Sequence, residues 1–359
     1  MSDRRVQGKG YSAARDRRID GVAVTGVAGG QESDMPPSEP AGPREPDPLE
    51  PAHGHALDPA DHRLLRGRPP AAALRWCATA VGGPRAAVTH VAALAGGTSS
   101  AVHAVQVRDG RDRVHALVLR RFVRADWLAE EPDLARHEAA ALELANSSGL
   151  PVPRLVAVDA DGAEAGAPAV LMTRLDGAVE WQPREPEPFL RALAEVLPRV
   201  HAVAVTGPAS AAIPGYAPYG LRLTGPPSWT RRPEVWERAL AAFAALAAAP
   251  PTAGGFIHRD YHPGNVLWAD GAVSGVVDWV NASHGSPDAD VGHCRMNLAG
   301  ALGPDAAERF LALHRSVSGR GEYHPVWDIA ASLGGFEDED VARWSRADED
   351  FLARAVARL

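Results

Sequence analysis

The 359-residue chain has a single lysine, Lys9, although arginine is frequent, and only two cysteines, Cys77 and Cys294. Two cysteines so far apart argue against a disulfide framework and favour a reducing compartment. The chain also lacks a run of about twenty apolar residues, so no segment is predicted to cross a membrane. The first residues, Met1 to Arg5, carry charge without the apolar stretch of a secretory or twin-arginine signal. We therefore expect a cytoplasmic protein with no membrane partner.

A basic surface is absent as well. The formal net charge is −8, which argues against a nucleic acid as the natural partner and mildly favours a cationic small molecule. Apolar residues make up 45% of the chain, enough for a substantial core. This length accommodates one two-lobed domain or two ordinary domains.

The N-terminal part of the chain, residues 1–70, contains few apolar residues. It is rich in Gly, Pro, Asp and Glu, and its prolines are densest between Pro36 and Pro48. Such a segment cannot bury enough apolar area to offset the entropy that ordering would cost. We predict a disordered extension over residues 1–70 and a globular pattern from Leu74 onward.

One polar stretch organises the rest of the chain. Residues 256–268 read as two short apolar strands around a polar loop, and residues 273–277 form a third strand after an Asp-Gly turn. This hairpin is expected to gather Asp260, Asn265 and Asp278 at one edge. Two carboxylates and an amide are the oxygen ligands that suit Mg²⁺.

The same stretch resembles the kinase superfamily. His258, Asp260 and Asn265 fit the pattern H-x-D-x-x-x-x-N, residues 262–265 read H-P-G-N, and residues 278–279 read D-W. These motifs are most similar to those of the aminoglycoside phosphotransferase and choline kinase family. The resemblance is most specific from residue 256 to residue 290.

This resemblance implies an α+β fold of the two-lobed protein-kinase type. Residues 74–176 would form an antiparallel β N-lobe that binds the nucleotide, and residues 177–359 a mainly helical C-lobe with the catalytic loop, metal site and acceptor pocket. The implied activity is that of a small-molecule kinase, which moves the γ-phosphoryl group of ATP to a hydroxyl. Asp260 would orient that hydroxyl and accept its proton, while Asn265 and Asp278 would hold Mg²⁺.

Some details separate the chain from protein kinases. His262 stands where those enzymes usually carry a lysine, and residues 279–280 read Trp-Val rather than Phe-Gly. Arg259, by contrast, matches the protein-kinase H-R-D motif. The balance favours a small-molecule enzyme.

A candidate nucleotide loop lies between two strand-like segments, residues 88–95 and 101–107. Small residues there would let backbone N–H groups approach phosphates. The expected phosphate-binding residues are Gly96, Gly97, Thr98 and Ser99.

The next strand, residues 114–123, takes the position of the kinase strand whose lysine meets the ATP phosphates. Because Lys9 lies in the extension, an arginine must replace that lysine. Arg120 occupies the matching position, and Arg121 alternates to the other face. Arginine is fully charged and can form a fork of hydrogen bonds to phosphate.

The partner of this arginine is expected on the following helix, residues 136–145. Glu138 is the natural candidate, and Glu143 is expected to face solvent. The resemblance further implies a hinge after the last N-lobe strand, where backbone groups near Met172 and Arg174 would bind the adenine edge.

The C-lobe contains two segments where family members build the acceptor pocket, residues 213–229 and 233–249. Neither has a recognisable substrate code. The resemblance also implies that Asp290 is a structural acid that braces the backbone of the catalytic loop.

Two other functions stay open at this point. The arginine at position 120 and the ordinary Gly96-Gly97 turn are compatible with a nucleotide-binding module that transfers nothing. His258, Asp260 and His262 could instead bind zinc in a hydrolase, since histidine and carboxylate suit that metal.

Overall fold

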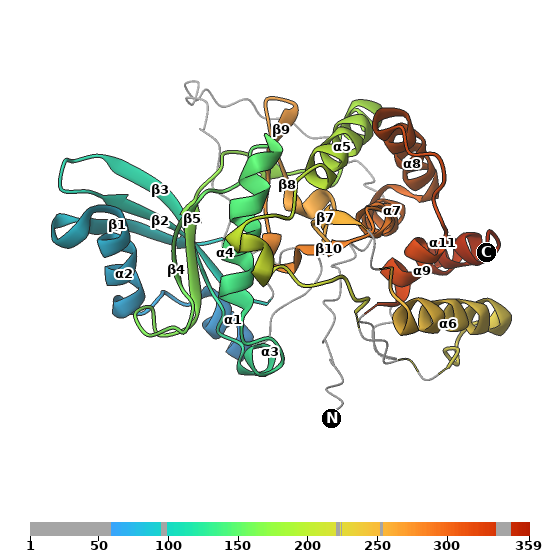
Figure 1. Cartoon of the computed structure of the whole chain (residues 1–359), viewed down its shortest axis with the longest axis horizontal. Coiled ribbons are helices and arrows are strands. Elements are labelled where there is room, and N and C mark those ends of the chain that lie inside the picture. Colours follow the sequence, from blue (N-terminus) through green and yellow to red (C-terminus); the bar gives the residue numbers. More distant parts are fainter. Residues whose placement is uncertain (1–58, 95–98, 220–222, 224, 252–253, 335–345) are drawn as a thin grey trace, which may run out of the picture.

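The computed structural model describes residues 59–94, 99–219, 223, 225–251, 254–334 and 346–359. A lobe built around a β-sheet lies at one end of the molecule, and a lobe made mainly of helices lies at the other (Figure 1). The predicted two-lobed α+β fold is confirmed.

The N-lobe sheet has five antiparallel strands in the order β1-β2-β3-β5-β4. The strands are β1 (Ala87–Ala93), β2 (Ala101–Arg108), β3 (Val114–Arg121), β4 (Leu155–Asp159) and β5 (Ala169–Thr173). Side chains alternate between the two faces of a strand. In β5, Ala169 and Leu171 therefore pack into one cluster, and Val170 and Met172 into another. The sheet is thus buried on both sides.

Helices α2 (Ala71–Gly82) and α4 (Leu134–Ala145) cover the two faces of this sheet. The lobe also contains α1 (Pro59–Arg66), which contacts β2, and α3 (Ala125–Glu130). Trp76 and Cys77 of α2 pack with Leu119 and Leu171 on one face. Leu142 of α4 joins the cluster on the other face, which continues into the C-lobe.

Helix α1 changes one expectation. The predicted disorder of residues 1–70 does not hold for the part from residue 59 onward, and residues 1–58 lie outside the described chain. Leu65 is fully buried, and the Arg66 guanidinium donates to the carbonyl of Leu94 over 2.6 Å. One buried leucine and the hydrogen bonds from Arg66 to Leu94 and from Arg124 to Asp61 attach a helix whose local sequence is too polar to predict burial.

Short strands begin the C-lobe. They are β6 (Ala178–Val179), β7 (Gly255–Ile257), β8 (Val266–Ala269), β9 (Ala272–Val276) and β10 (Ser283–Gly285). The predicted hairpin is β8–β9. Its two loop residues, Asp270 and Gly271, have φ of 51° and 76°, which is the conformation that an Asp-Gly hairpin turn requires.

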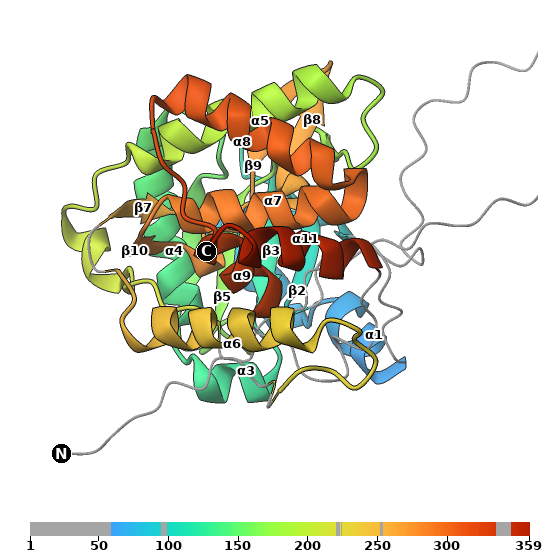
Figure 2. The same ribbon diagram turned by 90° about the vertical axis from the view of Figure 1, so that its right-hand side faces the viewer.

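Helices complete the C-lobe, as Figure 2 shows from its end. They are α5 (Pro186–His201), α6 (Pro233–Ala248), α7 (Asp288–Leu302), α8 (Pro304–Ser318), α9 (Val326–Leu333) and α11 (Arg346–Val356). Helix α7 packs between α8 and α9 and carries mostly buried residues. Within the described chain, no helix is both long and apolar enough to span a membrane.

Candidate active site

Asp290 holds the loop that carries Asp260. This loop follows β7, and the carboxylate of Asp290 on α7 accepts hydrogen bonds from the backbone N–H groups of His258 (2.9 Å) and Arg259 (2.6 Å). His201 of α5 lies 2.9 Å from the same carboxylate. Arg259 has φ of 68°, a left-handed conformation that is strained for a residue with a side chain. The bracing role expected of Asp290 is present, and it stabilises this strained backbone.

We expect Asp290→Asn to lower the free energy of unfolding by about 1.5–3 kcal/mol, because an amide cannot accept both backbone N–H groups as a charged carboxylate does. Chemical denaturation measures this change. Asp288→Asn is the matched control, since Asp288 lies two residues earlier and pairs with the exposed Arg320. Equal stability of the two variants would contradict the bracing role.

Asp260 lies among two histidines and an amide. The Asn265 side chain donates to the Asp260 carbonyl (2.8 Å) and to its Oδ2 (3.2 Å). Nε2 of His293, on α7, lies 3.0 Å from Oδ1 of Asp260, and Nε2 of His262 lies 3.8 Å from the same oxygen. The loop therefore presents one carboxylate in a fixed position, with Asn265 directing its amide nitrogen toward it.

These neighbours keep the Asp260 carboxyl ionised. Burial by itself would raise its pKa, but the contact with His293 and the nearby His262 outweigh that effect and hold the pKa well below its usual range. Burial lowers the pKa of His262 to about 4, against the attraction of Asp260. At neutral pH, Asp260 is a carboxylate able to accept a hydrogen bond from a hydroxyl.

The hairpin brings Asp278 to the same edge. The N–H of Val277 donates to the carbonyl of Asn265 over 2.9 Å, and His258 lies 2.9 Å from the carbonyl of Val277. Asp278 follows with φ of 65°, a second strained position close to the loop. Asp260, Asn265 and Asp278 are thereby gathered on one polar edge, as the sequence predicts.

Arg120 joins the two lobes. Its Nη1 donates to Glu138 of α4 (2.8 Å) and to Asp278 of the C-lobe (2.6 Å), and its Nε donates to the hydroxyl of Ser100 (2.8 Å). The expected contact with Glu138 is present, and Glu143 is exposed as expected. The contact with Asp278 spans 158 positions of sequence and was not anticipated.

In the cluster of Arg120, Glu138 and Asp278, burial and charge shift the pKa values in opposite directions. Burial disfavours the charged guanidinium, but Asp278 and Glu138 outweigh it and raise the pKa of Arg120. Burial also raises the pKa of Glu138, although Arg120 opposes the shift. One guanidinium thus faces two carboxylates.

This donor set fits a divalent cation. Asn265 contacts Asp260, and Asp278 follows Val277, whose N–H donates to the Asn265 carbonyl. The site therefore offers hard oxygen ligands, and its negative charge exceeds what Arg120 neutralises. Because the Asn265 nitrogen is directed at Asp260, its oxygen is the atom free to coordinate. Asn265 and Asp278 are the residues that would hold Mg²⁺.

A different group of three could also hold a metal: within the described residues, ligand atoms of Asp260, His262 and His293 lie within 4.8 Å of one another. His258 is not part of this group, so the structure does not assemble the predicted zinc triplet. Nδ1 of His262 accepts the N–H of Gly264 over 3.0 Å, which places the proton of the neutral ring on the Nε2 that faces Asp260. Zinc binding at this Nε2 would require the proton to move to Nδ1 and the hydrogen bond from Gly264 to be lost, which disfavours zinc at this group.

The structure describes some of the residues that are predicted to bind the nucleotide. Gly96, Gly97 and Thr98 lie outside the described residues, and Ser99 is buried just before β2. Met172 lies in β5, and the N–H of Arg174 donates to Ala116 within the sheet. Backbone contacts to an adenine edge would therefore use carbonyl groups or the residues that follow Arg174.

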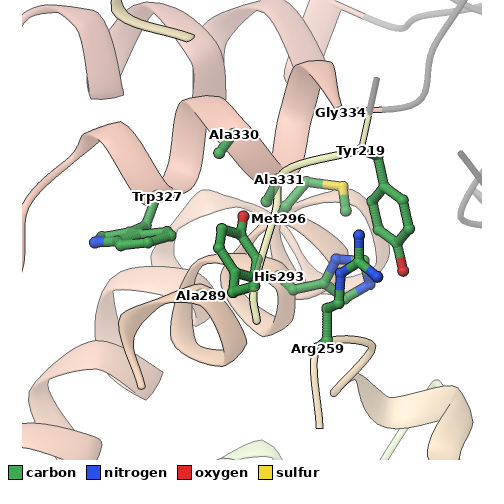
Figure 3. A pocket seen from close by; sticks show the side chains of 10 residues that line it. Tyr219, Arg259, Ala289, His293, Met296, Trp327, Ala330, Ala331 and Gly334 are labelled. Atoms are coloured by element: carbon green, nitrogen blue, oxygen red, sulfur yellow. The ribbon is translucent and has the colours of Figure 1, made fainter. Parts of the chain in front are cut away.

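Several residues of the site lie outside the motifs that the sequence shows. Ser100 directly follows the expected loop, and His293 lies one helical turn after Asp290, a spacing that places both on one face of α7. A pocket beside the loop also lies outside those motifs (Figure 3). Its lining residues are Tyr216, Tyr219, Arg259, Ala289, His293, Met296, Trp327, Ala330, Ala331 and Gly334. They come from four separate segments, and no local pattern links them.

Comparisons with known proteins agree with this architecture. Aminoglycoside phosphotransferase APH(4)-Ia is 17% identical, with a TM-score of 0.50, and the match covers 76% of this chain and 92% of that one. A thermostable mutant of that enzyme, in ternary complex with AMP-PNP and hygromycin B, is 18% identical over the same shares with a TM-score of 0.50. Macrolide 2′-phosphotransferase MphH from Brachybacterium faecium is 19% identical, covering 79% of this chain and 97% of that one, with a TM-score of 0.47. None of the curated proteins matches the sequence.

The fold is of the kinase-like class, which the APH(4)-Ia structures share. A family model described as "Phosphotransferase enzyme family" matches residues 90–326, about two thirds of the chain. The chain belongs to the phosphotransferase enzyme family.

Proposed function

We propose that this protein transfers the γ-phosphoryl group of ATP to a hydroxyl of a small molecule. The observation that carries the proposal is the gathering of Asp260, Asn265 and Asp278 on one edge, with Arg120 bridging to it from the opposite lobe. Membership of the phosphotransferase family supports this reaction type. The complex of a similar structure with AMP-PNP supports ATP as the donor.

The geometry supports the following roles. Asp260 accepts a hydrogen bond from the acceptor hydroxyl and aims its oxygen at the γ-phosphorus. As the new P–O bond forms, the bond to the β-phosphate breaks, ADP leaves, and the hydroxyl proton passes to Asp260. Arg120, held by Glu138, neutralises phosphate charge, and Mg²⁺ held by Asn265 and Asp278 would add to that neutralisation. Catalysis comes mainly from positioning and charge.

Asp278→Asn tests the nucleotide site. We expect it to weaken Mg²⁺-dependent ATP binding by about 10- to 100-fold, because one charged ligand contact of about 1.5–3 kcal/mol is lost. Calorimetric titration of ATP into the full chain, with and without Mg²⁺, measures this change. Asp270→Asn, at the exposed tip of the same hairpin, is the control. Unchanged Mg²⁺ dependence in Asp278→Asn would remove Asp278 from the metal site.

The same titration, combined with a turnover assay on hydroxyl acceptors, distinguishes the proposed kinase from a nucleotide-binding module. Saturable ATP binding without turnover on any hydroxyl acceptor would indicate a nucleotide-binding protein that transfers nothing. Absence of ATP binding in both conditions would contradict the proposed function itself.

A further inference from the structure

The pocket beside the catalytic loop has a distinctive charge. Arg259 contributes a guanidinium, and among the described lining residues there is no carboxylate. Asp260 and Glu131 lie near Tyr219; Asp260 is in contact with His293, and Asp290 accepts two backbone N–H groups. An ammonium group placed beside Arg259 would meet the positive charge of its guanidinium.

Arg259 is positioned between aromatic rings. Its guanidinium carbon lies 4.2 Å from the ring centroid of Tyr219 and 5.9 Å from that of Tyr216, and one nitrogen donates to the carbonyl of Ala217 over 2.8 Å. Figure 3 shows the arginine beside Tyr219 and His293, with Trp327 across the pocket. The guanidinium is therefore held in place before any ligand arrives.

Two polar atoms at this place lack a partner. Nε of Arg259 and the hydroxyl of Tyr219 are buried without a hydrogen bond to any described residue. Burial raises the pKa of Tyr219, so its hydroxyl keeps its proton and can donate. A buried donor without a partner costs about 1–3 kcal/mol. Both atoms are donors, so an oxygen acceptor on a ligand could satisfy each of them.

The backbone of Arg259 also adopts a strained conformation. Its φ of 68° lies in the region where glycine fits without strain. A side chain retained in a strained conformation, next to Asp260, indicates a use for that side chain.

The remaining walls are apolar and flat. Trp327 is almost fully buried, and Met296 and Ala330 lie with it on the helical side of the pocket. Aromatic and thioether surfaces favour planar apolar groups. The pocket thus combines a planar apolar wall with donors for oxygen.

We propose that this pocket binds the acceptor, and that it selects an acceptor with a planar apolar body and a carboxylate or similar oxygen group rather than a polycationic one. The inference rests on the proposed function, because the bound molecule is taken to present its hydroxyl to Asp260. It differs from the cationic acceptor that net charge alone favours, since the local guanidinium outweighs a diffuse surface charge.

A series of three alcohols that differ only in charge tests the proposal. They are para-(hydroxymethyl)benzoate, para-(hydroxymethyl)benzamide and para-(hydroxymethyl)benzylamine. Ligand-observed NMR titration of the full chain without nucleotide gives their affinities. We expect the benzoate to bind about tenfold more tightly than the benzamide, the effect of one charge-assisted hydrogen bond, and the benzylamine to bind most weakly.

Arg259→Gln should remove the advantage of the benzoate over the benzamide, and Tyr219→Phe should weaken both while keeping the ring. Arg191→Gln, an exposed arginine of α5, should leave all three affinities unchanged. Tightest binding of the benzylamine, equal binding of all three, or no binding of any would overturn the inference. Because no nucleotide is present, failure of ATP binding would contradict the proposed function without changing this result.

Discussion

Asp260→Asn should lower kcat by about 10²- to 10⁴-fold, the contribution of a positioned acid–base group. The variant keeps an oxygen and nearly the same volume, but its amide can no longer accept the proton of the acceptor hydroxyl. Affinity for ATP should change little, because Arg120 and Asp278 are untouched. Steady-state turnover with Mg²⁺ and ATP, on any acceptor that the wild type phosphorylates, gives kcat.

Asp305→Asn is the matched control for this experiment. Asp305 lies fully exposed at the start of α8, so its loss of charge should leave kcat unchanged. A native kcat in Asp260→Asn would mean that another group orients the hydroxyl. A lost affinity for ATP together with lost turnover would place Asp260 in the nucleotide site instead.

The second large effect is expected where Arg120 contacts Glu138 and Asp278 between the two lobes. Arg120→Met leaves Glu138, which is 1% exposed, without its counter-charge, and it also frees Asp278 and Ser100. Removing one partner of a buried ion pair lowers the free energy of unfolding by about 3–5 kcal/mol. Thermal unfolding of the variant should therefore begin well below that of the wild type.

Two further variants show whether the buried charge is the cause. Arg120→Met with Glu138→Gln removes both charges and should recover part of the lost stability. Arg120→Lys keeps the positive charge and should stay close to the wild type. If the double variant is no more stable than Arg120→Met, the loss comes from packing.

Nucleotide binding gives a second measurement on the same variants. Arg120→Met should weaken ATP binding by about 10- to 100-fold, the loss of one charged hydrogen bond to phosphate. The double variant recovers stability but not this affinity, because it still lacks the cation. An ATP affinity equal to that of the wild type in Arg120→Met would show that another group neutralises the phosphates.

Much of the site was predictable because its parts are local. Asp260 and Asn265 are five residues apart on one short loop, and the Asp-Gly turn of the β8–β9 hairpin carries Asp278 back beside them. Strand alternation separates Arg120 from Arg121, and helix periodicity separates Glu138 from Glu143. In each case the local backbone geometry decides where the side chains lie relative to one another. The arrangement therefore appears as a pattern over a few residues of the sequence.

The tertiary structure alone decided the contacts between distant segments. Arg120 meets Asp278 only because the lobes pack together, and His293 reaches Asp260 only because α7 lies behind the loop. The acceptor pocket joins Tyr219, Arg259 and Trp327 from separate segments, with no shared period or motif. The sequence by itself determined the polar edge of Asp260, Asn265 and Asp278 and the fold class. Packing between segments decided the charge of the pocket beside that edge, because long-range side-chain contacts leave no local pattern in a sequence.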